Sequence, residues 1–166
     1  MSQVDLLRNA PIFESLSDFE LEALAASLKE RIFARGVVIF HKGSPGNSLY
    51  LIESGKVRIF VLSDSGQEIT LNTHGPRECF GELALLDGLP RSASAVSLDR
   101  TRCCVLERGD FLNILESHPG MVRSILALLS GRVRHATTYA ESLAFLDVQS
   151  RIASTLLALA DRHGIE

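Results

Sequence analysis

Glycines recur at short, nearly regular intervals through the first half of the chain and limit each extended segment to a few residues. They stand at positions 36, 43, 46, 55, 66, 75 and 81. The run 56–62 places its β-branched residues Val57, Ile59 and Val61 at every second position, as a half-buried strand does. Many short strands separated by turn residues predict a small barrel or jelly roll.

We predict six strands from these runs. They cover residues 37–40, 49–53, 56–62, 68–73, 92–98 and 102–107. The turn Asp64-Ser65-Gly66 separates the third strand from the fourth, in which Ile69 and Leu71 would share a face. Before the strands, Ser17 and Glu20 have the spacing of a capping box.

The segment after Ser17 has apolar residues on one helical face, at Leu21, Leu24 and Leu28. It predicts an amphipathic lead helix of about 12–14 residues that covers one end of the strand domain.

The chain has 166 residues, of which 46% are hydrophobic and 22% are charged. This composition is typical of a folded globular protein. That length suits one domain, or one domain and part of a second. The net charge of −3 provides no basic surface for nucleic acid within these residues. No segment of the sequence approaches the run of about 18 apolar residues that a membrane-spanning helix needs. The N-terminus lacks the charged and then apolar regions of a signal peptide. We therefore expect no membrane partner.

The three cysteines, Cys79, Cys103 and Cys104, do not suit a disulfide framework, because their number is odd and two are adjacent. The chain has no Cys-x-x-Cys pair and no His pair at ligand spacing, so we expect no metal site. We interpret the cysteines as small buried hydrophobic residues in a reducing, cytoplasmic compartment.

The chain becomes helical from about residue 108. Asp110 can cap a short helix over 110–117, and Pro119 suits the first turn of a long helix over 119–146. Apolar residues with alternating spacings of four and three follow that helix, at Val122, Leu126, Leu129, Val133, Ala136, Ala140 and Leu143. A helix packed on its own β domain is one interpretation. We favour the other, a homodimeric coiled coil, because a narrow 3.5-residue seam keeps facing a partner helix.

Asp147 interrupts this pattern, and a new amphipathic helix is predicted over 149–164, with Ile152, Leu156 and Leu159 on one face. Since this helix has almost nothing of its own to pack on, we expect a further domain beyond it. The expected organisation is a strand domain over 1–117, a dimerisation helix over 118–146, and a hinge with the first helix of another domain over 147–166.

The strand domain is interrupted by FGELALLDGLPRSASA (80–95), in which Gly81 opens one or two helical turns. The free N–H groups of a helix start suit an anion. Arg91 can bind a phosphate in a two-pronged contact, and Ser92 adds a hydroxyl donor. Glu82 would accept hydrogen bonds from sugar hydroxyls. Together these residues suit a ligand with one phosphate charge and a ribose edge.

No nucleophile–base pair, metal set or carboxylate dyad stands out in the sequence, so we expect a binding protein and no enzyme.

This segment resembles the phosphate-binding cassette of cyclic-nucleotide-binding domains, and the whole chain is similar to the Crp/Fnr family of bacterial transcription regulators. The similarity extends through the long helix to LAFLDVQSRIASTLLALA (143–160). It implies an α+β fold: a β-roll or jelly-roll (double-stranded β-helix) domain with N-terminal helices and a long C-terminal dimerisation helix.

The resemblance implies a role for each cassette residue. Gly81 and Glu82 would hold the ribose, and Arg91 and Ser92 the cyclic phosphate. The remaining expected contacts come from the backbone of Leu83 and Ala84 and from the apolar wall beside the base, formed by Ile59 and Leu71.

In the family, a Thr-Ser pair on the long helix contacts adenine. Those positions fall on Ala136 and Thr137, with Thr138 one residue further on, so the first hydroxyl is missing. The pocket is expected to be retained, while the base it selects stays open.

The resemblance implies a cytoplasmic homodimer that binds cyclic AMP and controls a helix-turn-helix domain beyond residue 166, through which alone it would bind DNA. Cyclic GMP, cyclic di-GMP and haem are alternative effectors, and His74 and Cys79 lie near the region that would suit haem. A constitutive dimerisation domain is a further alternative.

Overall fold

The structure is a computed structural model that describes residues 2–145, 150, 152–153, 156–157 and 160. The chain divides into two compact units, Met1–Ile125 and Leu126–Glu166. The first unit contains the two β-sheets and most of the helices. The second contains most of the last long helix.

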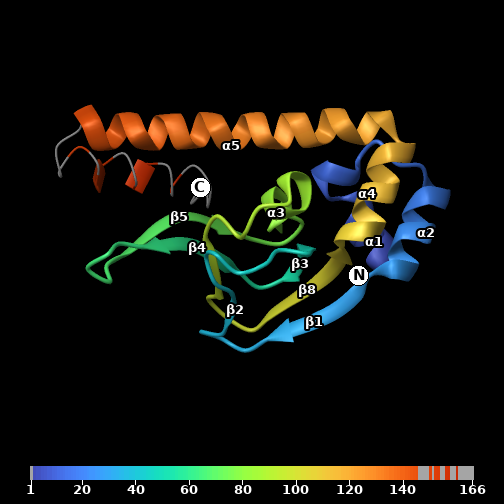
Figure 1. The fold of residues 1–166 in the computed structure, drawn as a ribbon, viewed down its shortest axis with the longest axis horizontal. Coiled ribbons are helices and arrows are strands. Elements are labelled where there is room, and N and C mark those ends of the chain that lie inside the picture. Colours follow the sequence, from blue (N-terminus) through green and yellow to red (C-terminus); the bar gives the residue numbers. More distant parts are fainter. Residues whose placement is uncertain (1, 146–149, 151, 154–155, 158–159, 161–166) are drawn as a thin grey trace. The chain divides into compact units, whose positions relative to one another are not determined.

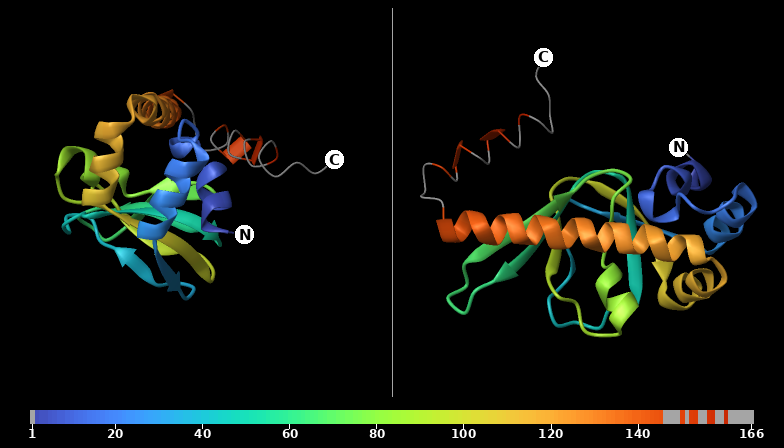
Figure 2. Two further views of the ribbon diagram at one scale, coloured as in Figure 1. Left: turned by 90° about the vertical axis from the view of Figure 1, so that its right-hand side faces the viewer. Right: turned by 90° about the horizontal axis from the view of Figure 1, so that it is seen from above.

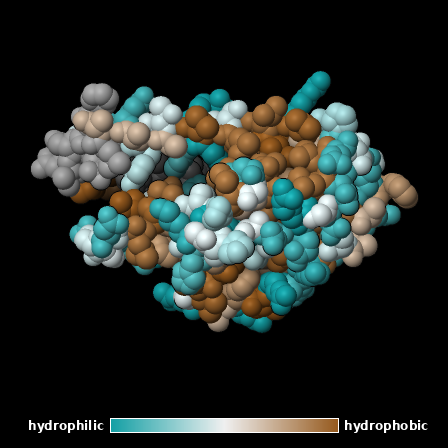
Figure 3. Space-filling view, in the orientation of Figure 1, coloured by the Kyte–Doolittle hydropathy of each residue, from teal (hydrophilic) through white to brown (hydrophobic). Residues whose placement is uncertain are grey.

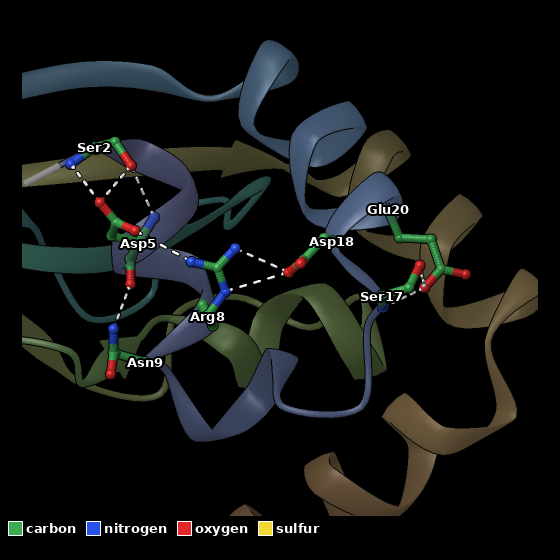
Figure 4. Close-up of polar contacts among 7 residues, drawn as sticks. All are labelled: Ser2, Asp5, Arg8, Asn9, Ser17, Asp18 and Glu20. Atoms are coloured by element: carbon green, nitrogen blue, oxygen red, sulfur yellow. Dashed lines mark hydrogen bonds and ion pairs between the residues drawn. The ribbon is translucent and has the colours of Figure 1, made fainter.

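Three helical segments open the first unit: α1 (Gln3–Arg8), the 3-10 turn η1 (Pro11–Phe13) and α2 (Asp18–Ser27). Arg8 joins α1 to α2, because its guanidinium group contacts the carboxylates of both Asp5 and Asp18 (Figure 4). The predicted capping box is confirmed, since the Glu20 carboxylate accepts hydrogen bonds from the backbone N–H and the hydroxyl of Ser17.

Eight strands follow among the described residues: β1 (Lys29–Phe33), β2 (Val38–Phe40), β3 (Ser48–Ser54), β4 (Val57–Leu62), β5 (Glu68–His74), β6 (Cys79–Phe80), β7 (Ser94–Ser97) and β8 (Thr101–Glu107). They form two antiparallel four-stranded sheets in the orders β1-β8-β3-β6 and β2-β7-β4-β5. The sheets make up the two-layered β-roll in Figure 1. The predicted fold class is therefore confirmed.

The sequence missed two strands. β1, KERIF, begins with three consecutive charged residues and is exposed along almost its whole length, so no apolar period marks it. It exists because it pairs with β8, from Lys29↔Val105 to Phe33↔Thr101. The lead helix is accordingly shorter than predicted: it ends at Ser27, and Leu28 already has an extended backbone. The other missed strand, β6, has only two residues.

The core of the roll lies between the sheets. Its fully buried centre takes one residue from each of five strands: Ile52, Val57, Phe80, Ala95 and Cys103. Partly buried rings from β1, β2 and β3 pack against this centre. The inside of the roll is therefore rich in aromatic side chains beside the segment that carries the cassette.

Helix α3 (Glu82–Asp87) interrupts the strands as predicted and packs on β3 (Figure 1). Helix α4 (Arg108–Ser117) begins two residues earlier than predicted, with Glu107 as its N-cap, so Asp110 lies in the first turn and is not the cap. Helices α1, α2 and α4 gather at one end of the sheets (Figures 1 and 2). There His118, the C-cap residue of α4, contacts Glu20 of α2.

Helix α5 (Pro119–Phe145) is continuous through the described residues. Hydrophobic side chains interrupt the hydrophilic surface of the chain in several places (Figure 3). On α5 they include Val122, Leu126 and Val133 of the predicted seam, with exposed fractions of 41%, 58% and 65%. In the part of the chain that the structure describes, every helix is too short or too polar to cross a bilayer. Some predicted features lie outside the described residues. They are the end of the dimerisation helix at residue 146, the hinge residues 147–149, Leu159, and the end of the last helix over 161–164.

The side chains of all three cysteines are buried, which supports their interpretation as hydrophobic side chains. Burial raises the pKa of Cys103 to about 12 and that of Cys104 to about 11, and neighbouring negative groups add to the shift.

We therefore expect a disulfide reagent at pH 8 to react slowly with the folded chain, because the thiolate that would attack it is scarce and inaccessible. In denaturant all three thiols should react quickly. The measurement is the release of the coloured thiol product over time. Rapid reaction of two equivalents in native buffer would contradict the described burial of Cys103 and Cys104.

Candidate functional site

Gly81 begins the cassette and has a backbone that other residues rarely adopt. It is the N-cap of α3, with φ of 85° and ψ of 7°, in the left-handed region. The next residue, Glu82, is fully buried, and Ala84 is 3% exposed. Leu83 points outward, with 38% of its surface exposed. The left-handed turn thus directs the Glu82 carboxylate into the protein at the start of the helix.

Arg91, ten residues further on, returns to the same place. Its side chain is buried, with 5% exposed. Its Nη1 donates to the carbonyl oxygen of Gly81 at 2.7 Å, and its Nη2 donates to the carbonyl oxygen of Ser48 at 2.8 Å. In the described part of the chain, its hydrogen-bond partners are carbonyl and hydroxyl oxygens and no carboxylates. The structure thus brings Gly81, Glu82 and Arg91 together.

Arg91 is a buried cation that keeps a free donor. Burial lowers the pKa of its guanidinium group, and the charges of Tyr50 and Glu82 oppose that shift. Among the described residues, no atom accepts a hydrogen bond from its Nε–H. A buried charge with an unused donor favours an anion as its partner.

The side chain of Arg91 fits in its place because two neighbouring residues are glycines, which have no Cβ. A Cβ on Gly81 would lie 2.6 Å from Nη1 of Arg91. A Cβ on Gly46 would lie 2.9 Å from Nε of Arg91 and 2.3 Å from the Cβ of Ala84. Gly46 therefore lets the loop between β2 and β3 approach the cassette and keeps the space beside Nε open.

Sequence reasoning missed four residues that shape the site: Phe40, Gly46, Ser48 and Tyr50. The guanidinium carbon of Arg91 lies 4.3 Å from the ring centre of Phe40 and 5.8 Å from that of Tyr50. The hydroxyl of Ser48 lies within 3.5 Å of that of Tyr50. The sequence signal near these residues is the glycine-rich loop 41–47. It predicts a turn, but it does not indicate that the turn contacts Arg91.

The other predicted residues lie in several different settings. Ser92 is exposed. Ile59 packs against the core between the sheets, while Leu71 is 39% exposed at a bulge of the β4–β5 pair. Thr137 and Thr138 are exposed on α5 in the second compact unit, where the Thr137 hydroxyl donates to the carbonyl oxygen of Val133. The expected roles of these residues beside the base stay predictions.

A separate groove of about 280 Å³ opens along the inner face of the β1-β8-β3 part of the sheet. Its lining consists of Lys29, Arg31, Phe33, Ser48, Tyr50, Val105 and Glu107. It shares Ser48 and Tyr50 with the surroundings of Arg91. The residues predicted to bind a ligand do not line it, so we do not assign it as their pocket.

Residues 30–118, the roll with its cassette, match the family model described as the cyclic nucleotide-binding domain. The chain belongs to that family. Within it, the chain groups with Crp-like transcription regulators, so the predicted resemblance is confirmed.

Two curated relatives cover almost all of the chain. The cyclic AMP receptor protein of Thermus thermophilus is 38% identical over 159 residues, which are 96% of this chain and 73% of that protein. A CRP-like cAMP-activated global transcriptional regulator of Mycobacterium tuberculosis is 34% identical over 162 residues, 98% of this chain and 72% of that protein.

The solved structure of the Thermus thermophilus Catabolite Activator Protein is similar in fold and sequence. It superposes with a TM-score of 0.73 at 38% identity, over 94% of this chain and 73% of that one.

Two buried groups lie in the cassette of this cyclic nucleotide-binding domain. The Nε–H of Arg91 is buried, and the bare Gly46 keeps a Cβ away from it. The side chain of Glu82 is buried at the start of α3. Membership of the family supports cyclic nucleotide sensing.

Because Gly81 is closely packed against Arg91, we expect an alanine at this position to lower the free energy of unfolding. Gly81→Ala should destabilise the fold more than Gly66→Ala, although both glycines have similar left-handed backbones, with φ of 85° and 81°. The strain of that backbone costs about 1–2 kcal/mol at either position. Only at Gly81 must the guanidinium group of Arg91 also move, since nothing lies within 4 Å of a Cβ on Gly66. Urea unfolding measures both free energies, and equal losses would contradict the described packing.

Proposed function

We propose that this chain is the effector-sensing part of a Crp-like transcription regulator and that its effector is cyclic AMP. The observation that carries the proposal is the buried guanidinium group of Arg91, which retains an unused donor beside the cassette. A cyclic phosphodiester carries one negative charge and acceptor oxygens, so it can supply an acceptor for the Nε–H, which has none in the described structure. The cAMP-related names of the relatives in Thermus and Mycobacterium support this choice of effector.

The other cassette residues take the parts that the family resemblance predicts. Glu82 accepts hydrogen bonds from the ribose hydroxyls, which its burial makes strong because no water competes. Gly81 allows the ribose to approach the backbone, and Ser92 adds a donor to the phosphate. Leu83 and Ala84 contact the nucleotide through their backbone N–H groups.

The base contacts rest on residues outside the cassette. Ile59 and Leu71 form the apolar wall beside the purine, and Thr137 and Thr138 supply the hydroxyls for its edge. Ala136 replaces the first hydroxyl of the family's pair, so Thr137 carries more of the choice between adenine and guanine. We therefore expect this domain to discriminate against cyclic GMP less strongly than a family member that has both hydroxyls of the pair.

Regulation follows if ligand binding favours one arrangement of the long helix α5. Two copies of α5 pair through the seam, and the bound nucleotide shifts the equilibrium between two arrangements of this pair. In a transcription regulator of this type, that shift is passed to the part of the protein that binds DNA. The chain itself performs no catalysis in this proposal.

Replacement of Arg91 tests the proposed site. Arg91→Ala should weaken cyclic AMP binding at least a hundredfold in calorimetric titration, because about 3 kcal/mol of charged hydrogen bonding is lost. Arg58→Ala is the matched control, since Arg58 also stacks on a phenylalanine of the roll but lies on the surface beside Glu68. Equal affinity of Arg91→Ala and the parent chain would rule out the cassette as the site.

The seam on α5 predicts a dimer that one charge disrupts. The parent chain should sediment at twice its mass of 18.1 kDa at micromolar concentration. Val133→Glu should sediment as a monomer, because the 65% exposed Val133 would place a carboxylate in the apolar seam. Arg134→Glu, one residue away and outside the seam, should leave the dimer intact. A parent chain that sediments as a monomer would contradict the coiled coil.

A further inference from the structure

Phe40 ends β2 and lies directly against the guanidinium group that the proposed function depends on. Its ring belongs to an aromatic cluster, with ring centres 5.8 Å from those of both Tyr50 and Phe80. The guanidinium carbon of Arg91 lies 4.3 Å from the centre of the Phe40 ring. At this distance the negative face of the ring attracts the cation.

Arg91 is a buried cation, with 5% of its surface exposed. It donates hydrogen bonds to the oxygens of Gly81 and Ser48, and the charge of Glu82 also acts on it. Cation–π attraction is stronger in such a desolvated setting than at the surface. The Phe40 ring therefore contributes to the stabilisation of this buried charge, and it lies nearer to the guanidinium carbon than the ring of Tyr50 does.

The loop that follows Phe40 holds the backbone of the same arginine. Gly43 donates its N–H to the carbonyl oxygen of Arg91 at 2.8 Å, and Arg91 donates its N–H to the carbonyl oxygen of Ser44 at 2.9 Å. Further along the loop, Gly46 approaches the side chain so closely that a Cβ would collide with it. The segment 40–46 thus contacts the backbone, the stem and the face of Arg91.

We propose that Phe40 is a positioning residue for the effector's phosphate: its ring, through cation–π attraction, holds the Arg91 guanidinium group in the place where the phosphate binds. The proposal rests on the proposed function. A guanidinium group that lies over a ring can still use the N–H groups at the edge of its plane, including Nε–H, to bind an anion. A cation that is already in place loses less freedom on binding, so the ring raises affinity without touching the ligand.

Fluorination of the ring tests this role with little change in size. Phe40 is replaced by 4-fluoro-, 3,5-difluoro- and 3,4,5-trifluorophenylalanine, which progressively weaken the negative face of the ring. Calorimetric titration with cyclic AMP should give a dissociation constant that rises stepwise, by about three- to tenfold for the trifluoro variant. The same series at Phe33 is the control, because this ring packs against the same core and contacts Tyr50 but has no guanidinium over it in the described structure.

Two outcomes would overturn the proposal. An unchanged dissociation constant across the Phe40 series would make the ring a packing residue only. A falling dissociation constant would mean that the ring competes with the phosphate for Arg91. Phe40→Tyr, which retains a π face, should bind cyclic AMP like the parent, whereas Phe40→Leu should bind it more weakly.

A ligand-free measurement separates this proposal from the proposed function. Failure of the parent to bind cyclic AMP would refute the proposed effector. The urea midpoint of the ligand-free chain would still report the stacking: it should fall stepwise in the Phe40 series and stay level in the Phe33 series. Equal midpoints in the two series would refute the positioning role independently of any ligand.

Discussion

The burial of one positive charge organises the site. A guanidinium group inside a protein must be compensated, and a carboxylate bound to it would compete with an anionic ligand. Here two carbonyl oxygens and an aromatic face stabilise Arg91, and the charge of Glu82 acts on it as well. These groups stabilise the cation without occupying its Nε–H donor. The same residue is therefore compatible with a folded, ligand-free domain and with binding of a phosphate.

The β-roll brings together the three segments that this arrangement needs. The cassette supplies Gly81 and Arg91, the start of β3 supplies Ser48, and the end of β2 supplies Phe40. Ser48 is 43 residues away from Arg91 in the chain. Antiparallel pairing of β3 with β6, with Tyr50 opposite Phe80, brings Ser48 to the start of the cassette. Pairing of β2 with β7, with Phe40 opposite Ala95, brings Phe40 to its end. The glycines at 46 and 81 then allow backbone and guanidinium group to come within contact distance.

How much the sequence predicts depends on how local each signal is. The alternating strands, the capping box and the glycine at the start of α3 follow from neighbouring residues, and all are present. The cassette is also local, because Gly81 and Arg91 are only ten residues apart. β1 has no local signal, since its pairing with β8 and not an apolar pattern makes it a strand. Phe40 and Ser48 were missed for the same reason: their contacts depend on strand register, which no short pattern specifies.

The most direct test of the central claim follows the Nε–H of Arg91 by ¹H–¹⁵N NMR in arginine-labelled protein. The signal is assigned by its loss in Arg91→Lys. On titration with cyclic AMP it should move strongly and saturate at one nucleotide per chain, because a phosphate oxygen becomes its acceptor. Adenosine, which lacks the phosphate, should leave it in place. A signal that stays unchanged while cyclic AMP binds would contradict the account.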